Sequence, residues 1–338
     1  MSFDQIRGQE KAIAILRHAL RNGRLAHAYL FIGPEGVGKR LTALTLFKAM
    51  NCKAPPEPAE SCETCPSCVK VNTSNHADWI LLEPEGETLK IDQVREMQRR
   101  IRFRPMEGGR RACILDPADS LNDAASNALL KTLEEPPQET HLFLITSRPH
   151  KLLPTILSRC QWVKFRPLPP GEIARILEGT RGLEADKARY YASLAGGSVG
   201  QAVALSDRVD FQKRLDWLQI FSQLAGKSSE EIFETCERLA KEGEEIEDLL
   251  NLWKIWVRDL VVLQVEGEEG KERLVNQDLL PAAQRDAARF SCERLEEIFG
   301  LISEIQKSLA FNANKQLALE TLMLGIRRET AGGKTARV

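Results

Sequence analysis

The sequence lacks net charge, a secretion signal and any long apolar run. Its 47 basic and 48 acidic residues give a formal net charge of −1, so any DNA contact must come from local patches. No apolar stretch is long enough to cross a bilayer, and the start Met-Ser-Phe-Asp-Gln lacks a basic-then-apolar pattern. We therefore expect a cytoplasmic protein whose cysteine thiols stay reduced.

The length and the order of secondary-structure signals predict several domains. A chain of 338 residues with 43% hydrophobic content can build two or three cores. Strands alternate with helices up to a proline cluster at 166–170, which predicts an α/β domain with a doubly wound parallel sheet. After the cluster the strand signals stop. We predict domains over 1–167, 168–207 (small, helical) and 208–328 (all-helical), with a disordered tail over 329–338.

Residues 31–40 have the spacing of a phosphate-binding loop, G-x-x-x-x-G-K. Gly33, Gly36 and Gly38 let backbone N–H groups turn toward a phosphate at a helix N-terminus, and Lys39 can reach its outer oxygens. An apolar run before the loop predicts a buried strand, and the residues after it predict a helix. A motif match in this strand–loop–helix context is much less often accidental than the same match elsewhere.

Two positions of the predicted nucleotide site, one in the phosphate loop and one after a later strand, are unsuited to hydrolysis. The loop should close with Ser or Thr, whose hydroxyl helps to hold Mg²⁺, but it closes with Arg40, which has only hydrogen-bond donors. A second apolar strand ends at Asp116, the form of a Walker B element, and here Asp116 would assist the bound metal. The next residue is Pro117, which cannot act as a base. The loop is thus predicted to hold phosphate without supporting hydrolysis.

Four of the eight cysteines lie close together, as Cys52, Cys62, Cys65 and Cys68. The pattern C-x9-C-x2-C-x2-C can close a tetrahedral Zn²⁺ site, and four protein ligands leave no open position. We expect a structural zinc. An iron–sulfur cluster is a second interpretation, although a ferredoxin run would place its fourth Cys where this chain has Asn72. Disulfides are a third.

Basic residues gather between positions 90 and 111. This segment contains eight basic residues and only three acidic ones. A solvated helix face and a phosphate-contacting surface explain this excess equally well. The basic residues are Lys90, Arg95, Arg99, Arg100, Arg102, Arg104, Arg110 and Arg111.

Apolar periodicity predicts the helices outside the central sheet. The first covers 5–22, and the long helices near the end of the chain cover 208–225, 229–242, 246–265, 284–308 and 312–327. Six aromatic residues at apolar positions of this last part are expected to form the core of a bundle. They are Trp217, Phe221, Trp253, Trp256, Phe299 and Phe311.

With these features in place, the chain resembles the AAA+ clamp-loader subunits of bacterial DNA polymerase III. The resemblance covers nearly the whole chain and implies an AAA+ domain over 1–167, a lid over 168–207 and an oligomerising collar over 208–328. The stretches that carry it are 27–31 before the phosphate loop, the four-cysteine insertion, 127–137 (Asn-Ala-Leu-Leu-Lys-Thr-Leu-Glu-Glu-Pro-Pro), 158–160 (Ser-Arg-Cys) and 312–320.

Two types of subunit compete within this family, the ATP-hydrolysing tau/gamma type and the delta-prime type. The tau/gamma pattern has Ser or Thr after the loop lysine, Asp-Glu in Walker B and a lid arginine, where this chain has Arg40, Pro117 and Gly200. All three departures point to the delta-prime type. They also leave open whether ATP or ADP still binds at this subunit's own loop.

The resemblance also implies a role for Arg159. In clamp loaders the arginine of Ser-Arg-Cys projects onto ATP bound by the neighbouring subunit, where a guanidinium can neutralise charge on the γ-phosphate. The implied partners are tau/gamma and delta subunits in a five-subunit ring, the sliding clamp and primed template DNA.

Two interpretations of another class remain open at this point. An active P-loop NTPase or nucleotide kinase would turn over ATP alone and lose that turnover with Lys39→Ala. A zinc-ribbon nucleic-acid-binding protein with a vestigial loop would bind DNA tightly alone and lose that binding when Cys65 is mutated.

Overall fold

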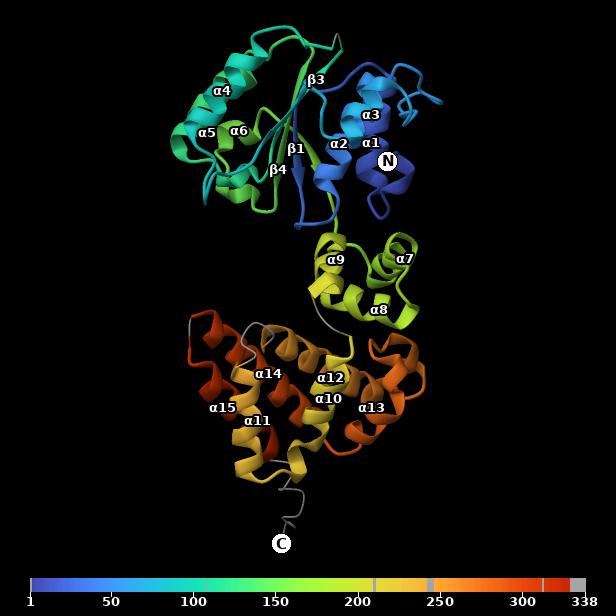
Figure 1. Ribbon diagram of the computed structural model, residues 1–338, viewed down its shortest axis with the longest axis vertical. Coiled ribbons are helices and arrows are strands. Elements are labelled where there is room, and N and C mark those ends of the chain that lie inside the picture. The colour runs from blue at the N-terminus through green and yellow to red at the C-terminus, as the bar shows by residue number, and fades with distance from the viewer. Residues whose placement is uncertain (1, 108, 209–210, 242–245, 312, 329–338) are drawn as a thin grey trace. The chain divides into compact units, whose positions relative to one another are not determined.

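A computed structural model describes residues 2–107, 109–208, 211–241, 246–311 and 313–328 of the chain (Figure 1). It divides into two compact units, Met1–Ile173 with Gly196–Gln201, and Ala174–Ala195 with Ala202–Val338. The predicted disordered tail 329–338 and Asn312, the first residue of one matching stretch, lie outside the described residues. No helix among the described residues is long and apolar enough to span a membrane.

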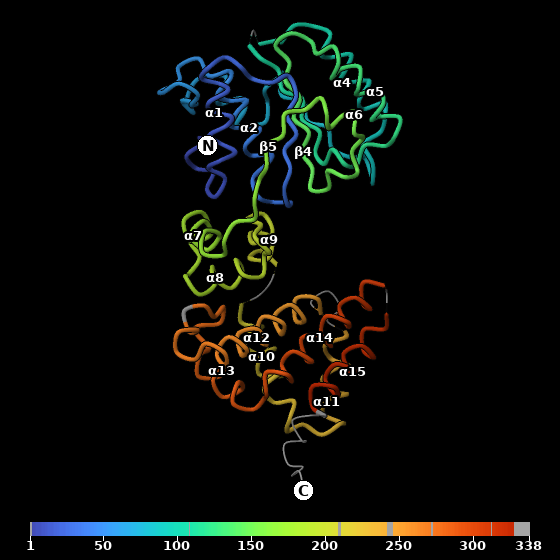
Figure 2. Tube along the Cα trace, turned by 180° about the vertical axis from the view of Figure 1, so that it is seen from behind, coloured from blue at the N-terminus to red at the C-terminus, as the bar shows by residue number. Residues whose placement is uncertain are grey.

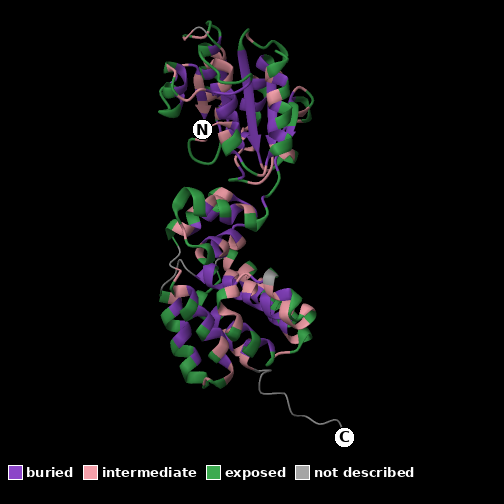
Figure 3. Cartoon of the chain, turned by 90° about the vertical axis from the view of Figure 1, so that its right-hand side faces the viewer, coloured by how far each residue is buried: buried purple, intermediate pink, exposed green. Residues whose placement is uncertain are grey.

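The first unit is built on a five-stranded parallel sheet with the order β2-β3-β4-β1-β5. All strand pairs in this sheet are parallel, which confirms the predicted parallel sheet. Every residue of β4 is buried because helices cover both faces of the sheet (Figure 3). The strands are β1 (Ala28–Ile32), β2 (Trp79–Leu82), β3 (Arg111–Leu115), β4 (Thr140–Thr146) and β5 (Gln161–Lys164).

Helices α1, α2 and α3 cover one face of the sheet, and α4, α5 and α6 cover the other (Figures 1 and 2). On the second face, Val94 and Met97 of α4 belong to the same core cluster as Leu129 and Leu133 of α5. The helices are α1 (Glu10–Arg21), α2 (Lys39–Asn51), α3 (Pro66–Asn72), α4 (Ile91–Ile101), α5 (Asp123–Glu134) and α6 (Pro154–Leu157), with 3₁₀ turns at Phe3–Gln5, Ala118–Ser120 and Pro149–Lys151.

The prediction of one helix over 5–22 is wrong at its start. Helix α1 begins at Glu10, because Gly8 adopts a positive φ of 76° that interrupts the helical backbone. The Gln9 side chain then binds the backbone of Arg166 in both directions, at 2.8 and 3.1 Å. The buried face of α1 includes Ala12, Ile13 and Leu16, while Ile15 is 43% exposed.

The described residues after 170 contain only helices and turns. The helices are α7 (Pro170–Arg181), α8 (Ala185–Leu194), α9 (Val199–Arg208), α10 (Lys213–Gln223), α11 (Ser229–Lys241), α12 (Ile246–Glu266), α13 (Leu280–Ala287), α14 (Cys292–Ala310) and α15 (Lys315–Arg328), with 3₁₀ turns at Leu224–Gly226, Glu269–Arg273 and Gln277–Leu279.

The predicted single helix over 284–308 is two helices. The Ser291 side chain accepts a hydrogen bond from the backbone N–H of Arg294 and so caps the start of α14. Gln264 on α12 donates to the carbonyls of Ala287 and Phe290, which satisfies backbone groups at the break. A side chain distant in sequence thus supports a break that apolar periodicity does not show.

Four of the six predicted core aromatics are buried. Trp253 donates its indole N–H to the carbonyl of Trp217 at 2.9 Å and packs edge-on against Phe221. Trp256 donates to Asp286 at 3.0 Å, so the indoles of Trp253 and Trp256 each have a polar partner. The prediction is wrong for two others, because Phe299 is 42% and Phe311 is 88% exposed.

Candidate nucleotide site and trans-acting arginine

The phosphate loop is closed against a second segment of the same unit. Gly36 has a φ of 70°, and a Cβ at this position would lie 2.2 Å from the Ser198 hydroxyl. The backbone N–H of Gly200 donates to the Gly36 carbonyl at 3.0 Å. Gly200, which stands where the tau/gamma pattern has an arginine, therefore contacts the loop through its backbone alone.

Lys39 is turned back onto its own loop. Its ammonium group donates to the carbonyls of Gly33 and Pro34, and the residue is 6% exposed. Burial lowers the pKa of Lys39, although Asp116, Glu35 and Asp119 favour its charged form. A phosphate bound in the loop would have to draw the ammonium group away from these two carbonyls.

Arg40 occupies the partner position of the Walker B carboxylate. Its Nε donates to Asp116 Oδ2 at 2.6 Å, and its Nη2 donates to Glu83 Oε1 at 2.6 Å. Because a guanidinium already neutralises Asp116, this carboxylate is a poor ligand for a divalent cation. The sequence predicted the missing hydroxyl at position 40, and the structure adds an internal cation that pairs with the acid.

A cavity of about 500 Å³ lies between the loop and the carboxyl ends of β3 and β4. Its lining includes Gly36, Gly38, Lys39 and Asp116 of the predicted nucleotide site, together with Arg40 and Pro117. Gly33, the fifth predicted residue, is not part of this lining. Asp119, the next carboxylate along the chain, is held by the Thr146 hydroxyl at 2.6 Å and by Arg148. Neither Pro117 nor this engaged carboxylate supplies a base for an attacking water.

The four clustered cysteines form a candidate metal centre. The Sγ atoms of Cys52, Cys62, Cys65 and Cys68 all lie within 4.8 Å of one another, and all four thiols are free. Backbone N–H groups point at the sulfurs, from Cys62 to Cys52 and from Cys65 to Cys62, both at 3.2 Å. The backbone N–H groups of Thr64 and Cys65 lower the pKa of Cys62 to about 6. This donor set suits a thiophilic cation.

A buried lysine fixes the cysteine segment to α2. Lys48 is 1% exposed and donates to both carboxylate oxygens of Glu63, at 2.7 and 2.8 Å, and to Asn72 at 2.9 Å. Burial disfavours the charge on Glu63, but its hydrogen bonds, led by those from Lys48, place its pKa well below the usual range. In the sequence, nothing points to this contact except that Glu63 lies between two of the clustered cysteines.

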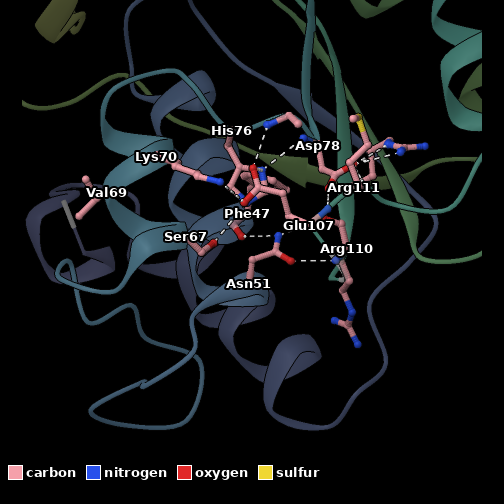
Figure 4. Close-up of polar contacts among 12 residues, drawn as sticks. Phe47, Asn51, Ser67, Val69, Lys70, His76, Asp78, Glu107, Arg110 and Arg111 are labelled. Carbon is pink, nitrogen blue, oxygen red and sulfur yellow. Dashed lines mark hydrogen bonds and ion pairs between the residues drawn. The ribbon is translucent and has the colours of Figure 1, made fainter.

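Arg111, one of the eight basic residues of the 90–111 segment, has a structural role. Its guanidinium is buried against the Asp78 carboxylate at 3.0 Å (Figure 4). It also donates to the carbonyls of Arg100, Phe103 and Arg104. Asp78 also accepts from the backbone N–H groups of Met106 and Glu107. A phosphate-contacting role is therefore excluded for Arg111. It stays a prediction for the exposed arginines of the segment.

Arg159 lies directly after α6 at the surface of the first unit. Its Nη2 donates to Glu134 Oε1 at 2.8 Å, and its Nη1 donates to the Thr155 carbonyl at 3.0 Å. Its side chain keeps 35% exposure. The sequence did not single out Glu134 as a partner, although it lies in the matching stretch 127–137.

The sheet order, the loop after β1 and the acidic end of β3 define an AAA+ P-loop fold. Two sequence families match the chain, one described as DNA polymerase III delta subunit over residues 8–169 and the other as its C-terminal part over 208–328. DNA polymerase III subunit delta' of Bacillus subtilis is 31% identical over 94% of this chain and 95% of its own length. The chain therefore belongs to the DNA polymerase III clamp-loader family, on its delta-prime branch.

Other proteins of this replication machinery are also similar. The tau subunit of Bacillus subtilis is 26% identical over 96% of this chain and 61% of its own length. A solved gamma-subunit-related protein of Thermotoga maritima is 19% identical, with a TM-score of 0.49 over 94% of this chain and 99% of its own.

Proposed function

We propose that this chain is a non-hydrolysing clamp-loader subunit that supplies Arg159 in trans to ATP bound by a neighbouring tau/gamma subunit. The observation that carries the proposal is the Arg40–Asp116 pair at 2.6 Å, which places a side-chain cation where hydrolysis needs Mg²⁺. Since Pro117 follows Asp116, the chain's own site lacks both the metal ligand set and the base. The half-buried Arg159 then provides the chemistry, at another subunit's site.

The proposed setting is a cytoplasmic five-subunit ring with tau/gamma and delta. In this ring the chain helps to load the sliding clamp onto primed DNA, and its all-helical C-terminal part serves as the collar. The relatives' names place them in the same polymerase, which supports this assignment.

We propose zinc as the ion of the cysteine cluster, with a structural role. Four thiolates leave no position for water or substrate, so Cys52, Cys62, Cys65 and Cys68 would only stabilise the fold around them. A purified chain should hold one zinc ion by elemental analysis. One iron–sulfur cluster, with its visible absorption, would contradict this assignment.

The trans role of Arg159 is tested by reconstituting the complex with tau/gamma and delta and measuring ATPase activity with clamp and primed DNA. Arg159→Ala should reduce kcat by about 10³-fold, as other trans arginines do, while the complex still assembles. Arg24→Ala is the control, because Arg24 is an exposed arginine that forms no ion pair among the described residues. Full activity of the Arg159→Ala complex would contradict the proposal, as would ATP turnover by the isolated chain.

A further inference from the structure

Arg159 is held by a cradle of acceptors that comes from two helices. Glu134 is the last residue of α5, and Thr155 lies within α6. The Glu134 carboxylate accepts from Nη2, while the Thr155 carbonyl and the Ser158 hydroxyl accept from Nη1 at 3.0 and 3.3 Å. Ser158 in turn donates to the Thr155 carbonyl at 3.1 Å, so the cradle is internally bonded.

This cradle leaves part of the guanidinium free. An arginine has five N–H donors in one plane, and the three hydrogen bonds use both donors of Nη1 and one of Nη2. Among the described residues, the Nε hydrogen and the second Nη2 hydrogen have no acceptor. Two coplanar donors match two oxygens of a phosphate, the geometry in which arginine binds phosphate most strongly.

Core packing fixes the two sides of the cradle relative to each other. Leu133, which precedes Glu134, is 2% exposed, and Cys160, which follows Arg159, is 9% exposed. Both side chains belong to one hydrophobic cluster with Ile156 of α6. Burial raises the pKa of the Cys160 thiol to about 12, so this cysteine is an unreactive packing residue. The end of α5 and the segment at α6 are therefore anchored in one core.

We propose that Glu134 is a positioning residue for the reaction at the neighbouring subunit's ATP. Its carboxylate orients the Arg159 guanidinium so that Nε and the second Nη2 hydrogen face outward to the γ-phosphate. The inference rests on the proposed trans role of Arg159. The pair is half exposed, 35% at Arg159 and 51% at Glu134, so it contributes little to folding, and its effect is on orientation.

The test uses the reconstituted complex with clamp and primed DNA. Glu134→Gln keeps the size of the side chain and removes its charge. We expect kcat to fall about tenfold, with KM for ATP and the thermal midpoint of the chain unchanged, because the orientation matters in the transition state. Glu135→Gln is the matched control, since Glu135 is exposed and forms no ion pair among the described residues. It should keep the original kcat.

A double variant shows whether Glu134 acts through Arg159. In an Arg159→Ala background, Glu134→Gln should cause no further loss. Suppose that Arg159→Ala slows the complex as proposed. The positioning role of Glu134 is then overturned if Glu134→Gln alone leaves kcat unchanged or raises it. It is also overturned if Glu134→Gln causes an equal loss of kcat in both backgrounds. If Arg159→Ala keeps full activity, the proposed function fails and the role of Glu134 fails with it.

Discussion

Ion pairs at single residues differ sharply in what they contribute. The Asp78 and Arg111 side chains are 1% and 3% exposed, and together they collect five backbone groups of the 100–107 segment. The Asp92–Arg95 pair on α4 is 85% and 61% exposed. Breaking a buried pair strands a charge in the interior, whereas a solvated pair is screened by water.

Asp78→Ala should therefore lower the free energy of unfolding by about 3–5 kcal/mol. Asp92→Ala, the matched surface variant, should change it by less than about 0.5 kcal/mol. Urea denaturation followed by circular dichroism measures both. Similar small losses in the two variants would show that Arg111 finds other partners.

His76 should make stability depend on pH. It is buried against Phe47, accepts from the Asp78 N–H at Nδ1 and lies 3.3 Å from the Ser67 hydroxyl. Burial lowers the pKa of His76 in the folded state below the 6.5 of an unfolded chain. The free energy of unfolding is therefore highest above pH 6.5, and it declines as the pH falls below 6.5 because the unfolded state takes up a proton first.

Between pH 7.5 and 6.0 the original chain should lose about 0.5 kcal/mol more than His76→Gln, which cannot titrate. Urea midpoints at both pH values give this difference. Equal losses in the two proteins would contradict it.

At the scale of elements, α2 joins three features of the first unit. It begins at the phosphate-loop residue Lys39, binds Glu63 of the cysteine segment through Lys48, and ends at Asn51. The Asn51 amide bonds the backbone of Arg110 in both directions, at 2.7 and 3.0 Å. One helix thus supports the loop, the candidate metal centre and the start of β3.

Lys48→Met should loosen the cysteine segment without removing a ligand. Glu63 would lose its buried cation, and zinc should transfer to a colorimetric chelator about tenfold faster, as seen when supporting contacts of metal sites are removed. Lys11→Met, an exposed position on α1, is the control. An unchanged release rate would show that the four thiolates hold the segment alone.

At the scale of the whole molecule, the second unit contains most of the predicted lid as well as the predicted collar. Arg214 of α10 lies over the Tyr190 ring of α8 and the Phe211 ring, at 5.2 and 4.1 Å from their centroids. The division into lid and collar stays a prediction. The C-terminal helices also expose Phe311, which packing within this chain does not explain.

Phe311→Ser should weaken assembly with tau/gamma and delta while leaving the unfolding midpoint of the isolated chain unchanged, because the side chain is 88% exposed there. Val265→Ser, at a position 69% exposed, is the comparison. Sedimentation velocity of the mixtures measures assembly. Equal sedimentation of all three complexes would place Phe311 outside the subunit contacts.

The sequence by itself determined the parallel sheet, the cysteine cluster and the residues from which loss of hydrolysis is predicted. These depend on local information: alternation of strands and helices, fixed motif spacing, and the presence of Arg40 and Pro117 where a hydroxyl and a base would be needed. The class of the chain followed from motif stretches for the same reason.

Only the tertiary structure decided which charges pair and which aromatic residues are buried. Glu134 lies 25 positions from Arg159, and Lys48 lies 15 from Glu63, so no periodicity within one element relates them. The break before α14 likewise depends on Gln264, which bonds the backbone of residues distant in sequence. The late start of α1 follows from the backbone turn at Gly8 and is accompanied by the bonds of Gln9 to Arg166. Packing between elements sets these contacts, and apolar patterns along one element contain no record of them.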